Sequence, residues 1–221
     1  MSRPVALVTG ASRGIGRAAA LALAARGFHV VATARTVGAL EELDDAIRAR
    51  TGDGATLLPL DLVKEAEQVD AIGPSLLERF GRLDALVHAA GLLPKLTPVA
   101  HIMPKDWADS LAVNVTACWR LIRSTDPLLR AAPAGRAVIL TDARAGEPLA
   151  YWGLYGAAKA AQHHLAATWA QEVANTPLRV LLHDPGPTAT YLRRVAMPGE
   201  DAATLRTAEA AGERIAELIG G

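Results

Sequence analysis

The chain has 221 residues, 51% of them hydrophobic, and its 23 lysines plus arginines balance its 23 aspartates plus glutamates. This length is typical of one domain or a small two-domain protein, and the balanced charge argues against a surface built for nucleic acid or an anionic membrane. The single cysteine, Cys118, cannot form an internal disulfide, and no apolar stretch approaches the roughly 18 residues of a membrane span. The N-terminal segment MSRPVALVTG lacks the features of a secretory leader, so we expect a cytoplasmic protein.

Six apolar runs of strand length alternate along the chain with amphipathic segments of helix length. The runs cover residues 5–8, 29–33, 55–60, 85–88, 137–140 and 179–183. They lack polar alternation, which predicts strands covered by helices on both faces. We therefore expect one α/β domain over residues 1–221, a Rossmann-type, doubly wound parallel sheet. Ligands of such sheets bind beyond the carboxyl ends of the strands.

The first of these ends carries the turn TGASRGIG, residues 9–16, followed by a segment of helix composition. Glycines allow a tight turn and a close approach of a pyrophosphate, and a helix N-terminus offers unpaired N–H groups. A glycine-rich turn alone is weak evidence. Its place between the first strand and the first helix predicts a dinucleotide site.

The end of the second strand bears on the choice of cofactor. An NAD enzyme is expected to place a carboxylate there for the ribose hydroxyls, but no acid occurs between Val30 and Leu40. Arg35 and Arg13 could instead bind a 2′-phosphate from two sides, since guanidinium groups suit phosphate oxygens. The alternative is a pair of solvated surface arginines. We expect NADP(H).

Tyr155 and Lys159 lie four residues apart in a segment that predicts a helix from about Leu154. The pair Tyr155-x-x-x-Lys159, together with the glycine-rich turn and its preceding Thr9, closely resembles the short-chain dehydrogenase/reductase family over nearly the whole chain. Further matches follow in order: Asp61, the segment HAAG at 88–91, Asn114, and the loop with Pro185, Gly186, Thr188 and Thr190. Two residues depart from the family pattern, Ala89 in place of asparagine and Asp142 in place of serine.

The resemblance implies a role for each matched residue. The cofactor-binding set is Gly10, Ser12, Arg13, Gly14, Ile15, Gly16, Arg35, Asp61, Ala90, Gly91, Lys159, Pro185, Gly186, Thr188 and Thr190. Tyr155 would donate the proton, and Lys159 would hold the ribose and, with an oxidised nicotinamide, favour the phenolate. Asn114 would position a water or kink its helix, or alternatively be a core amide.

Asp142 leaves several interpretations open. Serine in this place donates a hydrogen bond to the substrate, and an ionised aspartate cannot. Thr141 could take over if the strand end bulges, or Asp142 could merely cap a turn. In a partly desolvated cleft, Asp142 could also keep a proton and donate it to a carbonyl or an imine nitrogen. The segment Asp142-Ala143, followed by Pro148-Leu149, Tyr151 and Tyr155-x-x-x-Lys159, is similar to pteridine reductases of the same family, which use aspartate in this place. The stretch 185–201 instead looks like general bacterial members, so a pteridine is not the first choice of substrate.

The C-terminal part predicts a sheet without the seventh strand usual in the family, and a short substrate lid at about 191–205. Trp107, Trp119 and Trp169 are interpreted as core or subunit-contact residues, and the resemblance implies a homodimer or homotetramer. We expect an NADP-dependent reductase of a small carbonyl or imine, with no metal. The alternatives are a non-catalytic NADP-binding protein and a structural oligomer with a vestigial site.

Overall fold

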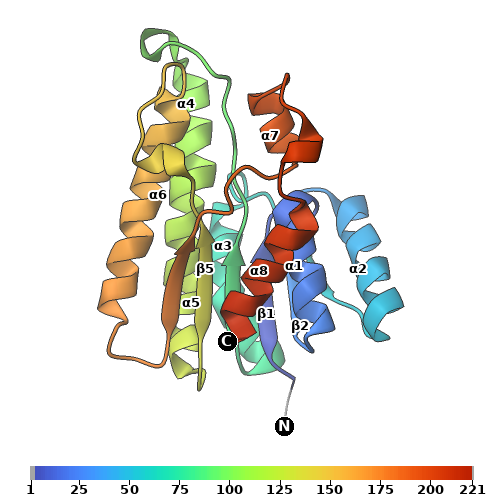
Figure 1. Cartoon of the computed structure of the whole chain (residues 1–221). Coiled ribbons are helices and arrows are strands. Elements are labelled where there is room, and N and C mark those ends of the chain that lie inside the picture. The colour runs from blue at the N-terminus through green and yellow to red at the C-terminus, as the bar shows by residue number, and fades with distance from the viewer. Residues whose placement is uncertain (1–2, 221) are drawn as a thin grey trace.

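A computed structural model describes residues 3–220. Its sheet contains β1 (Val5–Thr9), β2 (His29–Ala34), β3 (Thr56–Pro59), β4 (Ala85–His88), β5 (Arg136–Leu140) and β6 (Arg179–His183). All pairings are parallel, in the order β3-β2-β1-β4-β5-β6 (Figure 1). The predicted six-stranded parallel sheet is thus confirmed, and residues 3–220 form no seventh strand. The third strand is shorter than its apolar run at both ends.

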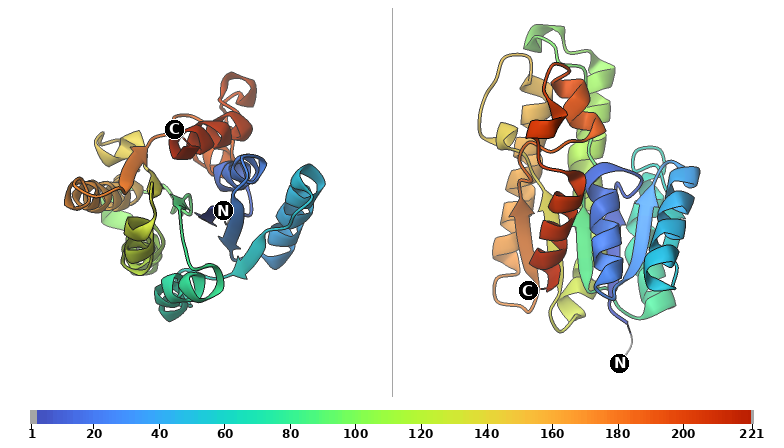
Figure 2. Two further views of the ribbon diagram at one scale, coloured as in Figure 1. Left: turned by 90° about the horizontal axis from the view of Figure 1, so that it is seen from below. Right: turned by 45° about the vertical axis from the view of Figure 1, so that its right-hand side comes forward.

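Helices cover both faces of the sheet, as the continuous apolar runs predicted. On one face lie α1 (Gly14–Ala25), α2 (Val37–Thr51) and α8 (Ala208–Gly220), and on the other α3 (Ala66–Phe80), α5 (Ala117–Ala131) and α6 (Gly153–Glu172). The left view of Figure 2, seen from below, shows these two layers of helices on either side of the sheet. Alternate residues of β1 enter opposite cores, Ala6 and Val8 toward α1 and Leu7 toward α5, which explains why polar alternation is missing.

Glycines let helices on each face approach closely. A Cβ on Gly212 of α8 would lie 2.5 Å from the carbonyl carbon of Ala18 in α1. On the opposite face, a Cβ on Gly73 of α3 would lie 1.8 Å from the carbonyl oxygen of Ser124 in α5. Neither position has room for a side chain, so both layers are tightly packed.

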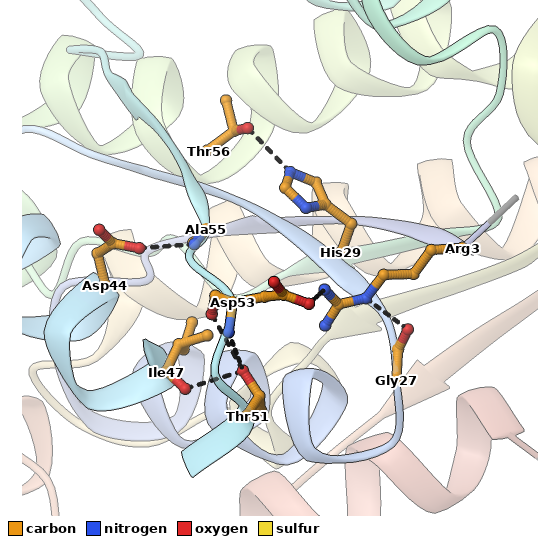
Figure 3. Close-up of polar contacts among 9 residues, drawn as sticks. All are labelled: Arg3, Gly27, His29, Asp44, Ile47, Thr51, Asp53, Ala55 and Thr56. Atoms are coloured by element: carbon orange, nitrogen blue, oxygen red, sulfur yellow. Dashed lines mark hydrogen bonds and ion pairs between the residues drawn. The ribbon is translucent and has the colours of Figure 1, made fainter. Parts of the chain in front are cut away.

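Polar contacts connect the segments that lead into β1, β2 and β3, at the amino ends of these strands and away from the predicted site. Arg3 donates from Nε to the Gly27 carbonyl at 2.8 Å and from Nη1 to Asp53 at 3.1 Å, which joins the segment before β1 to the turn before β2 and to the turn after α2 (Figure 3). Asp44 of α2 accepts the Ala55 N–H at 2.6 Å, just before β3. These contacts fix the start of the short edge strand.

Shorter elements extend from the carboxyl edge. They are η1 (Val99–His101), α4 (Pro104–Leu111), the π-turn η2 (Ala112–Thr116), η3 (Ala143–Ala145), α7 (Tyr191–Ala196) and η4 (Ala202–Thr204). In Figure 1, α7 lies apart from the helical layers, beyond the ends of the strands. None of the helices within 3–220 is long and apolar enough to cross a membrane.

The tryptophans divide between core and surface. Trp169 is buried, and its Nε1 donates to Asp126 at 2.7 Å, so this residue belongs to the core as expected. Trp107 is 46% exposed and Trp119 is 43% exposed, which rules them out as core residues of the chain. The subunit-contact interpretation of these two stays a prediction.

Candidate active site

A cavity of about 390 Å³ opens at the carboxyl edge of the sheet, within the range of small-molecule sites. Its walls come from the loops after β1, β2, β3, β4, β5 and β6, the start of α6 and the segment that enters α7. The predicted residues in its walls are Gly10, Ser12, Arg13, Gly14, Ile15, Gly16, Arg35, Asp61, Ala90, Gly91, Asp142, Tyr155, Lys159, Pro185, Gly186, Thr188 and Thr190. The structure brings together all predicted site residues except Asn114.

The glycine-rich turn has the conformation that its sequence predicts. Gly10 and Gly14 have φ values of 66° and 55°, which side chains rarely adopt. A Cβ on Gly16 would lie 2.3 Å from the Gly10 carbonyl oxygen, so only glycine lets α1 begin this close to β1. The N-terminus of α1 therefore faces the cavity as a site suited to phosphate.

Thr9 connects the glycine-rich turn to the loop after β4. Its Oγ1 accepts the Ala90 N–H at 3.2 Å and lies 2.9 Å from His88 Nδ1. Burial, and secondarily the charge of Lys159, lowers the pKa of His88 to about 3, so the ring is neutral. Its Nε2 is buried and has no hydrogen-bond partner among the described residues. The segment HAAG is thus held by Thr9 in spite of its departure from the family pattern.

The two arginines predicted for a 2′-phosphate both line the cavity but differ in their contacts. The Arg13 guanidinium stacks on the Tyr191 ring, 4.6 Å from its centroid. Arg35 follows β2 and is exposed. Burial acts to raise the pKa of Asp61, but the N–H groups of Val63 and Lys64 and the charge of Arg35 outweigh it and lower that pKa. A clamp of both arginines on one phosphate stays a prediction.

Tyr155 and Lys159 project from the first turns of α6, as the sequence predicted. The Tyr155 hydroxyl donates to Asp142 Oδ2 at 3.2 Å, and the Trp152 ring packs edge-on against Tyr155 at 5.8 Å. Lys159 donates from Nζ to the Leu140 carbonyl at 2.7 Å and to Gln162 Oε1 at 2.6 Å. Asp142, Tyr155 and Lys159 therefore form one contiguous group in the wall of the cavity.

Burial and nearby charges shift the pKa values of both Tyr155 and Lys159. Burial raises the pKa of Tyr155, and the carboxylates of Asp142 and Asp184 raise it further. Burial also lowers the pKa of Lys159 to about 8, against the opposing effect of Asp142. Burial and two nearby carboxylates thus keep Tyr155 protonated in the protein without cofactor, and the expected preference for the phenolate beside an oxidised nicotinamide stays a prediction. Tyr155 holds its proton.

Both oxygens of Asp142 accept hydrogen bonds. Oδ1 accepts the Arg144 N–H at 2.9 Å and caps η3, while Oδ2 accepts from Tyr155. Asp142 thus caps a turn and also contacts the proton donor. Thr141 also lines the cavity, and its Oγ1 lies 3.3 Å from His163 Nδ1, so the Thr141 alternative stays a prediction. A protonated Asp142 stays a prediction.

Asn114 lies outside the cavity, in the π-turn between α4 and α5. The Ala117 N–H donates to the Ala112 carbonyl, one residue farther than in an α-helix, so the expected irregularity of the helix is present. The buried side chain of Asn114 accepts the Leu92 N–H and donates to the Leu92 carbonyl, each at 2.9 Å. Asn114 therefore fixes the loop after β4 and contacts the site only through it.

The segment after β6 folds back over the glycine-rich turn. Thr190 caps α7 by accepting the Arg193 N–H at 3.2 Å, and its Cγ2 lies 3.4 Å from the place of a Cβ on Gly14. Arg193 makes two 2.6 Å bonds to Glu200, which close the predicted lid on itself. Substrate-lid function for 191–205 stays a prediction.

Several residues of the site were not predicted from the sequence, chiefly Trp152, Asp184 and Gln162. Asp184 directly follows β6, so the rule that ligands bind at the carboxyl ends of strands could have identified it. Trp152 precedes α6 and covers Tyr155. Gln162 lies three residues after Lys159, and this spacing places both on neighbouring parts of one helix face.

A family model for short chain dehydrogenases matches residues 4–201, which include the whole site described above. The chain belongs to the short chain dehydrogenase family. The oxidoreductase YciK of Escherichia coli (strain K12) is 34% identical over 204 residues, which are 92% of this chain and 81% of YciK.

Solved structures agree with this assignment. A short chain dehydrogenase from Shigella flexneri 2a str. 301 in complex with NADP has a TM-score of 0.94 and 32% identity, covering 99% of this chain and 91% of that one. A second short chain dehydrogenase, from Escherichia coli CFT073 in complex with NADPH, has a TM-score of 0.94, 33% identity and the same coverage. The matched relatives are named oxidoreductases and dehydrogenases.

Proposed function

We propose that this short chain dehydrogenase is an NADP(H)-dependent reductase of a small carbonyl compound, with Tyr155 as the proton donor. The observation that carries the proposal is the hydrogen bond from the buried Tyr155 hydroxyl to Asp142, in the cavity that also contains the glycine-rich turn. A tyrosine whose pKa is raised stays protonated at neutral pH, so the proton that a reduction requires is already on Tyr155.

NADP(H) fits the residues of the cavity. The conformation of Gly10 and Gly14 and the close approach at Gly16 leave the start of α1 open to a pyrophosphate. Arg13 and Arg35 line the same cavity and supply positive charge for a 2′-phosphate. Two structurally similar short chain dehydrogenases were solved with NADP and NADPH. NADPH, when bound, supplies the hydride.

The residues of the chain divide the remaining work. Tyr155 gives its proton to the substrate oxygen as hydride arrives at the carbon, and Lys159 holds the ribose and supports the charge left on the phenolate. Asp142 fixes the direction of the Tyr155 hydroxyl. Asn114 acts as a positioning residue, through the loop that it holds at Leu92.

A second candidate substrate is an imine. Asp142 Oδ2 faces the cavity as an acceptor, where it could bind an N–H next to a reducible C=N bond. An ionised Asp142 offers no donor to a ketone oxygen. We propose further that the chain is a single cytoplasmic domain with a lid at 191–205, and that Trp107 and Trp119 contact another subunit of a homodimer or homotetramer.

Oxidation of NADPH, followed by absorbance against a panel of ketones, aldehydes, quinones and pterins, tests the proposal. Tyr155→Phe should lower kcat on the best substrate by about 100-fold or more, because it removes the general acid while the ring still packs. Tyr151→Phe, in the exposed turn before α6, is the matched control and should keep wild-type rates. Wild-type turnover by Tyr155→Phe would overturn the assignment of the donor.

A further inference from the structure

Lys159 is buried, and among residues 3–220 its ammonium group has two hydrogen-bond acceptors. The residue is 6% exposed, and its Nζ donates to the Leu140 carbonyl at 2.7 Å and to Gln162 Oε1 at 2.6 Å. The first acceptor belongs to the backbone of β5 and is present whatever the side chain. Gln162 is thus the side chain that completes the support of this charge, and one N–H of Lys159 remains for the cavity that it lines.

Gln162 itself is poorly explained as a core residue. It is 1% exposed, and its Nε2 has no hydrogen-bond partner among the described residues. Burial raises the pKa of the Cys118 thiol on α5 and Gln162 opposes that rise, but no hydrogen bond joins Gln162 Nε2 to Cys118 or to any other described residue. An unpaired buried amide is costly, and an apolar side chain would fill the same space without that cost. The bond to Lys159 gives a reason for glutamine here.

We propose that Gln162 is a positioning residue, which holds the Lys159 ammonium charged and directed toward the cofactor side of the cavity through the bond from Nζ to Oε1. The consequence for the reaction rests on the proposed function, because it requires that Lys159 binds the cofactor. The bond itself exists without the cofactor and can be tested alone.

Other groups also act on Lys159 and must be separated from Gln162. Burial lowers the pKa of Lys159 to about 8, and the charges of Asp142, Cys118 and Asp184 oppose this. The titratable groups around Lys159 are His88 from β4, Cys118 from α5, Asp142 after β5, Tyr155 on α6 and Asp184 after β6. A substitution of Gln162 leaves all of these residues in place. Gln162 affects the pKa of Cys118, but burial raises that pKa to about 12, so the thiol stays neutral where Lys159 titrates and the difference between variants reports the bond.

The substitution Gln162→Met keeps the length of the side chain and removes its oxygen. A hydrogen bond to a charged group is worth about 1.5–3 kcal/mol, which corresponds to a fall of about one to two pH units in the midpoint of Lys159. Gln162→Glu keeps an acceptor and adds negative charge, so it should move the midpoint above that of the wild type. Gln171→Met replaces an exposed glutamine of the same helix and should leave it unchanged.

NMR of protein with 13C-labelled lysine measures this midpoint directly without cofactor. The chain has four lysines, Lys64, Lys95, Lys105 and Lys159, and Lys159→Met identifies the signal of interest. An unchanged midpoint of Lys159 in Gln162→Met would overturn the proposal. If Gln162→Met fails to fold, Gln162→Glu decides, and a midpoint equal to that of the wild type would overturn the proposal.

NADPH binding between pH 6 and 10 supplies the functional arm. In the wild type, the affinity for NADPH should fall as pH rises through the midpoint of Lys159. In Gln162→Met this fall should begin about one to two pH units lower, and in Gln162→Glu it should return to the pH range of the wild type or above. If the wild type does not bind NADPH at all, the proposed function fails while the NMR result still decides the role of Gln162. If the NMR midpoint moves and the binding profile does not, Gln162 tunes Lys159 without positioning it for the cofactor, and that part of the inference is wrong.

Discussion

Replacing His88 with asparagine should make the protein less sensitive to acid. His88 is 1% exposed at the end of β4, and burial lowers its pKa from 6.5 to about 3. An unfolded chain takes up a proton on this ring near pH 6.5, whereas the folded chain excludes it until about pH 3. Within this window the unfolded state binds more protons, so the free energy of unfolding rises with pH and is lost as pH falls.

The size of the effect follows from the two pKa values. Each pH unit within the window changes the free energy of unfolding by about 1.4 kcal/mol per proton. Between pH 7.5 and pH 5.0 the wild type crosses about 1.5 units of the window, so His88 accounts for a loss of about 2 kcal/mol. Asparagine does not titrate and loses nothing in this range. It also offers a donor and an acceptor for the bond to Thr9 Oγ1.

Urea unfolding at both pH values, followed by the fluorescence of the four tryptophans, measures this difference. The contributions of His29, His183 and the carboxylates are common to both proteins and cancel in the comparison. His164→Asn, which replaces an exposed histidine of α6, controls for the loss of a histidine as such. A gap between wild type and His88→Asn that stays the same at pH 7.5 and pH 5.0 would show that His88 is not held neutral by burial.

Two further predictions concern the cofactor side of the cavity. Gly16→Ala should cost about 1–3 kcal/mol of stability and weaken NADPH binding, because its Cβ would lie 2.3 Å from a backbone oxygen, whereas Gly38→Ala, with nothing within 4 Å, should be neutral or slightly stabilising in urea unfolding. Arg35→Ala should raise the calorimetric Kd of NADPH by about 10-fold or more, through loss of a charge-assisted contact, and leave that of NADH unchanged. An equal effect on the two cofactors would contradict the assignment of a 2′-phosphate site to Arg35.

The sequence was informative where backbone demands and apolar patterns determine structure. Six apolar runs without alternation predicted the parallel sheet covered on both faces. The glycines of residues 9–16 predicted the turn, because glycine readily adopts the φ of 66° at Gly10 and a Cβ does not fit beside the backbone at Gly16. The expected run at 55–60 was longer than β3. Apolar residues also continue into the turns at both ends of this edge strand, and composition alone does not show where pairing ends.

The charge states of the site could not be predicted in the same way. The spacing of Tyr155 and Lys159, four residues apart on one helix, predicted an ammonium group that favours the phenolate. The pKa of Tyr155 also depends on how deeply Trp152 and the surrounding chain bury it. The contribution of Asp184 comes from a strand end far away in the sequence. Asn114 was identified by its motif, yet its bonds to Leu92 depend on the path of a loop that no local pattern specifies.

Asp142→Ser, which restores the residue usual in the family, should let the Tyr155 phenolate form at a lower pH. Burial has the largest effect on the pKa of Tyr155, and Asp142 has the next largest. Asp142 raises this pKa by its charge and by accepting a hydrogen bond from the Tyr155 hydroxyl. Losing a charge-assisted bond of about 1.5–3 kcal/mol corresponds to a fall of about one to two units in that pKa. Oxidation of the alcohol product by NADP+ requires the phenolate, so its rate should rise with pH and reach half of its plateau at a pH one to two units lower in the variant.

The pH profile of both directions then separates the two roles open to Asp142. Asp142→Asn removes the charge but keeps an oxygen acceptor, so its midpoint for oxidation should fall between those of the wild type and Asp142→Ser. Reduction at neutral pH should change little, because Tyr155 stays protonated in each protein. If reduction by the wild type instead declines toward alkaline pH and Asp142→Ser abolishes that decline, a proton on Asp142 takes part in the reaction. Its contact with Tyr155 would then serve to share that proton, and the carboxylate role argued from the two accepted hydrogen bonds would be wrong.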